Sequence, residues 1–239
     1  MKHLLIALTL FTSIILLSIS CTGSSNDAQY DADIVVVGGG TSGVAAAIQA
    51  SRMGADVLLV EQTEWLGGML TAAGVSATDG NHQMPSGMWG EFRDKLYERY
   101  GSPEALFTGW VSNTMFEPSV GDSILKAMVA EQENLQIEYG YRLTDAESES
   151  GRLVSATFVN NDGNEITLRA RQFIDATEYG DLTAAAGADY SIYMETQDET
   201  GEEAAPEDPH PYVQDMTYVA ILKDYGPGTD NTIEQPANY

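Results

Sequence analysis

The sequence predicts an α/β fold built on a parallel sheet, and three observations near its start support that prediction. An apolar run at residues 33–37 precedes glycines 38, 40 and 43, an Ala-rich stretch follows them, and a second apolar run at 57–60 ends in Glu61. This order predicts a strand, a tight turn, a helix and a second strand. The unbroken apolar runs are typical of parallel strands that are covered on both faces.

The glycines have the G-x-G-x-x-G spacing of a dinucleotide-binding turn. In such a turn the first glycine makes the tight bend, the second lets backbone approach a pyrophosphate, and the third brings helix and strand together. The pyrophosphate would lie at the helix N-terminus, where N–H groups and the helix dipole favour an anion, and Glu61 would bind the ribose hydroxyls. The alternative is a glycine-rich loop in an ordinary α/β unit, with Glu61 at a solvent-facing strand end.

Helices are predicted where apolar residues recur at three- and four-residue spacing. They are expected over residues 44–53, 89–100 and 120–133. Large aromatic side chains are usually buried, so the core is expected to include Trp89 and Trp110.

Strands are predicted in the second half of the chain from apolar runs and alternation. We expect strands at 135–141, at 153–159 and 165–170 on either side of a hairpin turn over 160–164, and a buried strand at 172–177. This antiparallel meander occupies a place where a simple NAD dehydrogenase would more often have a helix. The order of elements therefore indicates a flavin.

The N-terminus has the pattern of an export signal. A short basic start at Lys2 and a mostly apolar stretch predict a signal peptide over residues 1–20. The small residue before Cys21 resembles a bacterial lipobox, so we expect lipidation of Cys21 and a polar tether over 21–31. An ordinary cleaved signal and an uncleaved anchor are the alternatives.

The charge balance argues against a nucleic-acid partner. Eleven Lys and Arg stand against 36 Asp and Glu, which gives a formal charge of −25 that repels polyanions. Many of the acids lie in one Gly- and Pro-containing stretch, which is expected to be a solvated loop. A metal site made from its carboxylates is the alternative. The acids of this stretch are Glu195, Asp198, Glu199, Glu202, Glu203, Glu207 and Asp208.

Three blocks of sequence resemble a known family. They are residues 33–68, 139–143 and 174–182, and residues 214–217 resemble the entry into that family's substrate region. In these blocks the chain resembles the FAD-dependent oxidoreductases with a glutathione-reductase-like FAD domain, most closely the group called xanthan lyase-like. The resemblance implies a Rossmann-like FAD-binding domain with a parallel sheet and an antiparallel β-meander.

The resemblance also implies roles for individual residues in binding FAD. Glu61 would bind the adenosine ribose, and Gly67 and Gly68 would pass near the ribityl and flavin side. The backbone at Leu143 would meet the adenine edge, and Thr177 would lie near the phosphates. Five residues would cradle the pyrophosphate: Gly38, Gly40, Thr41, Ser42 and Gly43.

One position departs from the family's pattern. Many relatives have Gly where this chain has Glu178. A carboxylate close to a pyrophosphate is unfavourable, so we expect Glu178 to turn away from the cofactor.

The resemblance further implies how the chain is divided. It places an FAD-binding domain at 32–185, with a helical insertion at 81–134, and the incomplete start of a substrate domain at 186–239. Relatives continue well past this point, and a late segment returns to complete the flavin pocket. We therefore expect this chain to be truncated at its C-terminus.

Two classes of function follow. In the first, the chain is an oxidoreductase whose FAD accepts a hydride from an unknown small organic substrate. His82 and His210 are candidates for the catalytic site, although a surface or hydrogen-bonded loop histidine is the simpler interpretation of each. With Cys21 as the sole cysteine, disulfide reductase chemistry is excluded. The second class is a non-catalytic or fragmentary FAD- or nucleotide-binding envelope lipoprotein, which would touch the membrane through Cys21.

Overall fold

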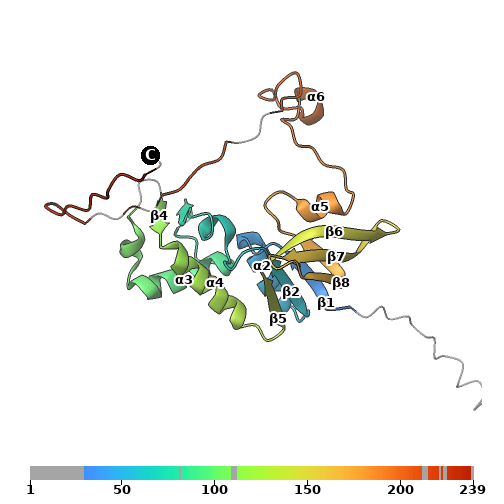
Figure 1. Cartoon of the computed structure of the whole chain (residues 1–239), viewed down its shortest axis with the longest axis horizontal. Coiled ribbons are helices and arrows are strands. Elements are labelled where there is room, and N and C mark those ends of the chain that lie inside the picture. The colour runs from blue at the N-terminus through green and yellow to red at the C-terminus, as the bar shows by residue number, and fades with distance from the viewer. Residues whose placement is uncertain are drawn as a thin grey trace, which may run out of the picture. The chain divides into compact units, whose positions relative to one another are not determined.

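A mainly parallel core sheet, extended by an antiparallel meander, organises the chain (Figure 1). The structure, a computed structural model, describes residues 30–80, 82–108, 112–211, 215–220, 222 and 225–237. Within these residues six strands follow the order β5-β2-β1-β8-β7-β6. β1 (Ala32–Val37) lies between β2 (Val57–Glu61) and β8 (Glu165–Asp175) and runs parallel to both, and β5 (Leu135–Tyr139) pairs in parallel with β2.

The meander consists of β6 (Tyr141–Glu149), β7 (Arg152–Asn160) and the first half of β8. The turn before β8 forms as the sequence predicts: the side-chain oxygen of Asn160 accepts from the amides of Asp162 and Asn164 at 3.0 and 2.9 Å. β8 then continues without a break into its parallel pairing with β1. The expectation of two strands, at 165–170 and 172–177, is therefore wrong, because one long strand serves both pairings.

Three helices pack beside the parallel strands, α2 (Thr41–Arg52), α3 (Gly87–Tyr100) and α4 (Pro118–Ala130). The smaller elements are η1 (Gly68–Leu70), β3 (Ala77–Asp79), η2 (Pro103–Leu106), β4 (Ser112–Met115), α5 (Asp181–Ala185) and α6 (Gln197–Thr200). β3 and β4 pair with each other, so the region expected to be a helical insertion also contains a strand.

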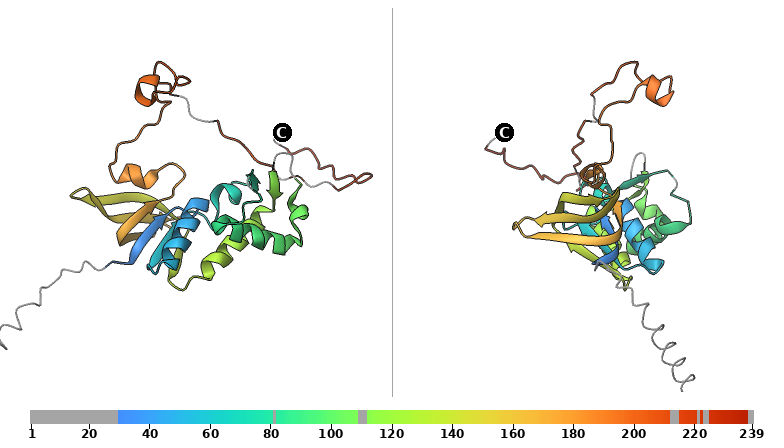
Figure 2. Two further views of the ribbon diagram at one scale, coloured as in Figure 1. Left: turned by 180° about the vertical axis from the view of Figure 1, so that it is seen from behind. Right: turned by 90° about the vertical axis from the view of Figure 1, so that its right-hand side faces the viewer.

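The parallel strands bury both of their faces. On β1, Val36 joins an apolar cluster completed by α2, α3 and α4, whereas Val35 and Val37 join a second cluster completed by the meander and α5. On β2, Leu59 faces the first cluster and Leu58 the second. The right-hand view of Figure 2 shows the yellow and gold meander strands on one side and the blue and green helices on the other. This two-sided burial explains why both strands are apolar along their length.

Other sequence expectations hold with shifted ends. The strand expected at 135–141 stops at Tyr139, because Gly140 has a φ of +75° and separates β5 from β6. The helix expected at 120–133 begins earlier, at Pro118, whose fixed φ suits the first turn. Trp89 is half-buried and packs against the first cluster.

Several expectations lie outside the described residues. These are the signal peptide, the lipidated Cys21, most of the tether, Trp110 and Gln214. Of the helices in the described part of the chain, none has the length and apolar character needed to cross a membrane.

Candidate functional site

The glycine turn joins the end of β1 to the start of α2. Gly38 has a φ of +101°, and a Cβ there would lie 2.4 Å from the carbonyl oxygen of Ala176. A Cβ on Gly43 would lie 1.8 Å from the carbonyl oxygen of Gly38. Both glycines are thus required by the packing of strand, turn and helix. A Cβ on Gly40 would meet only the Glu178 carboxylate, at 3.3 Å, so Gly40 leaves space on the outer side of the turn.

Glu61 ends β2 directly beneath this turn. Its carboxylate is buried, with the residue 8% exposed, and Oε2 accepts a hydrogen bond from the amide of Gly39 at 2.6 Å. Oε1 accepts from the amide and hydroxyl of Thr63 at 2.8 and 2.7 Å. A carboxylate has about four lone-pair sites, and these bonds use three, so one remains for a ribose hydroxyl. The role of Glu61 at a ribose stays a prediction.

Gly39 is a residue whose role the sequence reasoning missed. A Cβ there would lie 2.9 Å from Glu61 Oε2 and 2.9 Å from a methyl of Leu66. The unbroken run of three glycines is the signal for this role, because the motif spacing accounts for Gly38, Gly40 and Gly43 but not for Gly39.

The second glycine pair lies against the first turn. The amide of Gly67 donates to the carbonyl of Gly39 at 2.8 Å, and Gly40 and Gly67 form a parallel bridge. A Cβ on Gly68 would lie 3.1 Å from the Cα of Gly40. The two glycine segments, separate in the sequence, therefore form one cradle beside the N-terminus of α2, where Thr41 and Ser42 are exposed.

A cavity of about 430 Å³ opens beside this cradle, at the carboxyl ends of β1 and β2. Ligands of open α/β sheets bind at this edge of the strands. Leu143 on β6 and Thr177 after β8 line the cavity together with parts of the glycine turn, so the structure brings both predicted residues to the same place. Its further lining residues are Val37, Gly38, Gly40, Val60, Gln62, Tyr141, Arg142, Thr144, Ala176, Glu178, Tyr179, Asp181 and Ala185.

Asp175, at the end of β8, holds the loop that carries Thr177, and the sequence does not assign it a role. Its Oδ1 accepts from the amide and hydroxyl of Thr177 at 3.0 and 2.8 Å, and its Oδ2 from those of Thr183, both at 2.7 Å. Partial burial favours the neutral acid, but the hydrogen bonds from Thr183 and Thr177 outweigh it and lower the pKa of Asp175. The ionised carboxylate thus fixes the loop that carries Thr177.

Glu178 does not turn away from the cradle. Its Oε1 lies 2.8 Å from the position of a Cβ on Gly68 and 3.3 Å from one on Gly40. The residue is exposed, so no packed neighbour forces this conformation. The expectation rested on repulsion by a bound phosphate. The expectation that Glu178 turns away is therefore wrong, because its carboxylate lies against Gly68 and Gly40.

A second cavity of about 440 Å³ begins at Thr41, on the other side of the helix start. Most of its lining is apolar, with Asp79 as a charged residue among Val44, Ala45, Leu70, Met84, Met88, Trp89, Phe92 and Leu125. Two cavities therefore lie near the start of α2, and the second has the more apolar lining.

The two histidine candidates line neither cavity. The ring of His82 makes a hydrogen bond with Asn113 at 3.3 Å and an edge contact with Phe107, which agrees with a hydrogen-bonded loop histidine. His210 pairs through its backbone with Met194. Among the described side chains, no group of three or more His, Cys, Asp or Glu could hold a metal ion, and the acid-rich stretch after residue 194 forms no such group there.

Comparison with known proteins gives a family and several partial likenesses. The model of the family described as FAD dependent oxidoreductase matches residues 33–238. Over 68 residues the chain is 41% identical to the NADH:fumarate oxidoreductase of Klebsiella pneumoniae (strain 342). The matched segment makes up 28% of this chain and 7% of that protein. The solved structure of AlpK is 19% identical, with a TM-score of 0.49 over 70% of this chain and 36% of that chain. A flavoprotein/dehydrogenase from Cytophaga hutchinsonii is 22% identical, with a TM-score of 0.49 over 66% of this chain and 42% of that chain. The chain thus spans less than half the length of each of these three proteins.

Proposed function

The chain belongs to the FAD dependent oxidoreductase family, and we propose that its glycine cradle holds the pyrophosphate of FAD for the oxidation of a small organic substrate. FAD is the cofactor of this family. The observation that best supports the site is the bridge between Gly40 and Gly67 at the start of α2, with Gly68 close to Gly40. The absence of side chains there lets backbone N–H groups approach a phosphate, while the helix dipole favours its charge.

The residues around the cradle fit a dinucleotide with two unlike ends. With the pyrophosphate at Gly40 and Thr41, the adenosine would extend into the cavity lined by Leu143 and Thr177. Glu61 would accept a hydrogen bond from a ribose hydroxyl through its remaining lone pair. The flavin would extend toward the apolar cavity that begins at Thr41.

The chain's own residues supply binding and orientation. When bound, FAD supplies a two-electron acceptor for a hydride from a carbon atom of the substrate. The hydrogen bonds of Glu61 hold the glycine turn, and those of Asp175 hold the loop that carries Thr177, which reduces the ordering that FAD binding requires. The exposed carboxylate of Glu178, beside Gly68 and Gly40, opposes an anion at the cradle.

Titration of the purified full chain with three ligands tests this proposal. FAD should bind with a stoichiometry of one, ADP should compete with it, and FMN, which lacks the adenosine half, should bind far more weakly. Equal affinity for FMN and FAD would contradict the placement of adenosine beside Leu143. For the oxidoreductase activity, loss of the visible absorbance of bound flavin in the absence of oxygen identifies a substrate that delivers a hydride.

We also propose that the chain is exported and anchored to the membrane by a lipid on Cys21. The basic start, the apolar stretch and the small residue before Cys21 support this proposal. Mass spectrometry of the mature N-terminus in membrane fractions tests it, and a Cys21→Ser variant is the matched control. An unmodified Cys21 in the mature chain would contradict the anchor.

A further inference from the structure

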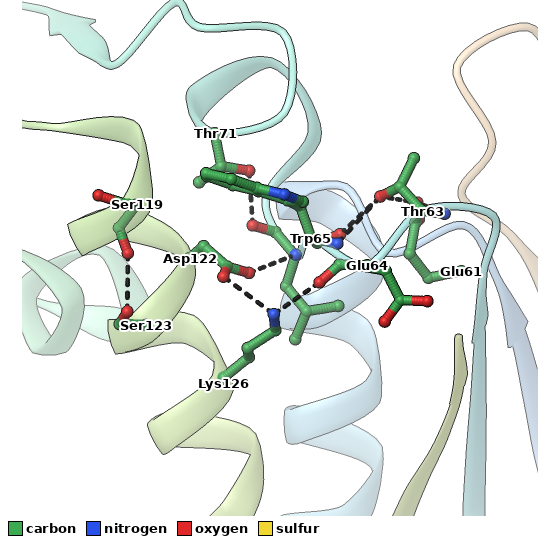
Figure 3. Close-up of polar contacts among 10 residues, drawn as sticks. Glu61, Thr63, Glu64, Trp65, Thr71, Ser119, Asp122, Ser123 and Lys126 are labelled. Carbon is green, nitrogen blue, oxygen red and sulfur yellow. Dashed lines mark hydrogen bonds and ion pairs between the residues drawn. The ribbon is translucent and has the colours of Figure 1, made fainter. Parts of the chain in front are cut away.

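The loop between β2 and η1, residues 62–67, is held by side chains of α4 (Figure 3). Asp122 accepts a hydrogen bond from the amide of Leu66 through Oδ1 at 2.8 Å. Its Oδ2 lies 2.9 Å from Lys126 Nζ, and the same ammonium group donates to the carbonyl of Glu64 at 2.6 Å. Two side chains one helical turn apart thus bind two backbone groups of the loop.

The pinned loop leads directly into the cradle. Leu66 precedes Gly67, whose amide donates to the carbonyl of Gly39 at 2.8 Å. The amide of Gly39 in turn donates to Glu61 at 2.6 Å. An unbroken path of covalent and hydrogen bonds therefore runs from Asp122 to the glycine turn and the acid at the end of β2.

The packing of α4 against the loop leaves little freedom for other arrangements. A Cβ on Gly67 would lie 2.6 Å from a methyl of Leu125, and a Cβ on Gly121 would lie 2.6 Å from the ring of Phe116. The hydroxyl of Thr71, which is 2% exposed, donates to the carbonyl of Leu66 at 2.6 Å. Both the amide and the carbonyl of Leu66 are therefore hydrogen-bonded to side chains outside the loop.

Asp122 is an unusual residue to bury at this position. It is 9% exposed, and a buried carboxylate is unfavourable unless it is both paired and hydrogen-bonded. Lys126 supplies the opposite charge that pairs with the Asp122 carboxylate, and its ammonium group also lies 5.4 Å from the ring centre of Tyr139. Burial and the nearby carboxylates of Asp122, Glu64 and Glu61 raise the pKa of Tyr139 to about 12, so the phenol stays neutral here.

We propose that Asp122 is a positioning residue for FAD: with Lys126 it sets the loop through Leu66, and the loop sets Gly67 and Gly68 against Gly40. This inference rests on the proposed binding of FAD at the cradle. Asp122 touches no cofactor atom in this scheme. It acts by keeping the loop in the conformation that binding requires, so that ordering the loop does not weaken affinity.

The test compares Asp122→Ala with Asp122→Asn in the full chain, by FAD affinity and by hydrogen exchange of the loop without FAD. Alanine leaves the Leu66 amide without its acceptor, so the loop relaxes and FAD affinity should fall about tenfold. Asparagine keeps an acceptor for that amide and loses only a partly exposed ion pair, so affinity should stay within about threefold of wild type. Such rescue by the conservative variant is not expected if Asp122 only adds charge-pair stability.

Lys95→Met is the matched control on the same helix pair. It removes the 2.7 Å ion pair between Lys95 on α3 and Glu131 at the end of α4 without touching the loop. FAD affinity and loop exchange should equal those of wild type. If Asp122→Ala does not fold, Lys126→Met takes its place, because it removes the bond to Glu64 and leaves the one to Leu66. Its affinity should fall about threefold.

The outcomes separate this inference from the proposed function. The positioning role would be overturned if Asp122→Ala bound FAD with wild-type affinity. Where Lys126→Met replaces that variant, wild-type affinity in Lys126→Met would overturn it. An equal loss of FAD affinity in the control Lys95→Met would also overturn it. If the wild-type chain binds no FAD, the proposed function fails. Faster exchange of the loop amides in Asp122→Ala would then still show that Asp122 sets the loop, and unchanged exchange would overturn that as well.

Discussion

Replacing Glu178 by Gln should tighten FAD binding, because it removes a negative charge beside the proposed pyrophosphate. The carboxylate lies 3.3 Å from the Cβ position of Gly40, so a phosphate on that glycine would come within roughly 4–5 Å of it. Two unit charges about 4 Å apart repel by about 1 kcal/mol in water and by about 4 kcal/mol at an effective dielectric constant of about 20. Glu178 is exposed and able to rotate, so the low end applies. We expect affinity to rise about five- to tenfold.

Fluorescence titration with FAD at two salt concentrations measures this effect. At about 1 M salt the screening length is about 3 Å, so the advantage of the Gln variant should shrink to about twofold. Glu165→Gln is the control, because it changes the net charge by the same amount at the opposite end of β8. At a rise of about 3.3 Å per residue, Glu165 lies about 30 Å from the end of β8 that precedes Glu178. Unchanged affinity in Glu178→Gln, or an equal gain in Glu165→Gln, would refute the reasoning.

Three further substitutions test the cradle. Gly43→Ala should destabilise the fold by more than about 3 kcal/mol, because its Cβ would lie 1.8 Å from a backbone oxygen, and wild-type stability in urea unfolding would contradict this. Glu61→Gln should lower the free energy of unfolding by roughly 1–3 kcal/mol, since its NH₂ group must face a backbone or hydroxyl donor; an unchanged thermal midpoint would be inconsistent with that geometry. Hydrogen bonds lower the pKa of Asp175 in the folded chain, so its ionised form stabilises the fold. This stabilisation is fully present above the unfolded-state pKa of about 3.9, and it is lost as the pH falls through the lower pKa of the folded state. Urea unfolding over a pH series should therefore show Asp175→Asn less stable than wild type near neutrality, with the gap closing in acid; a pH-independent gap would show that ionisation plays no part.

Local signals in the sequence predict the first βαβ unit well. The apolar runs of β1 and β2 alternate between two buried faces, and the tightest contact of Gly43 is with Gly38, five positions before it. These features are visible in any short window of sequence. The helix begins at Thr41 rather than 44, because its first turn lies inside the glycine spacing itself.

Strands with weak apolar patterns are harder to predict. β6 runs from Tyr141 to Glu149 and is mostly exposed and polar, so periodicity gives little sign of it. The sequence predicts two strands on either side of Arg171, at 165–170 and 172–177, and pairing with both β7 and β1 makes β8 continuous. Such pairing is a tertiary property that local propensity does not encode.

The supporting residues of the site depend on contacts between distant segments. Asp122 binds the amide of Leu66, 56 positions away in the sequence. The sequence places Asp175 inside a buried strand expected over 172–177, and only the fold of the turn after β8 shows that its carboxylate accepts four hydrogen bonds. The expectation for Glu178 rests on charge alone, whereas the position of its carboxylate beside Gly68 and Gly40 depends on how segments distant in the sequence meet.

The most direct test of the cradle is the FAD affinity of Gly40→Ala. At φ −61° an alanine is unstrained, and its Cβ would meet only the flexible end of Glu178, so the variant should fold with a thermal midpoint close to wild type. The same methyl group would occupy the space where the pyrophosphate approaches the backbone. Gln49→Ala, at an exposed position on α2, is the control. We predict that Gly40→Ala loses at least about tenfold in FAD affinity, since the phosphate loses its backbone hydrogen bonds, while the control does not. A folded Gly40→Ala variant with wild-type affinity would contradict the assignment of the cradle to FAD.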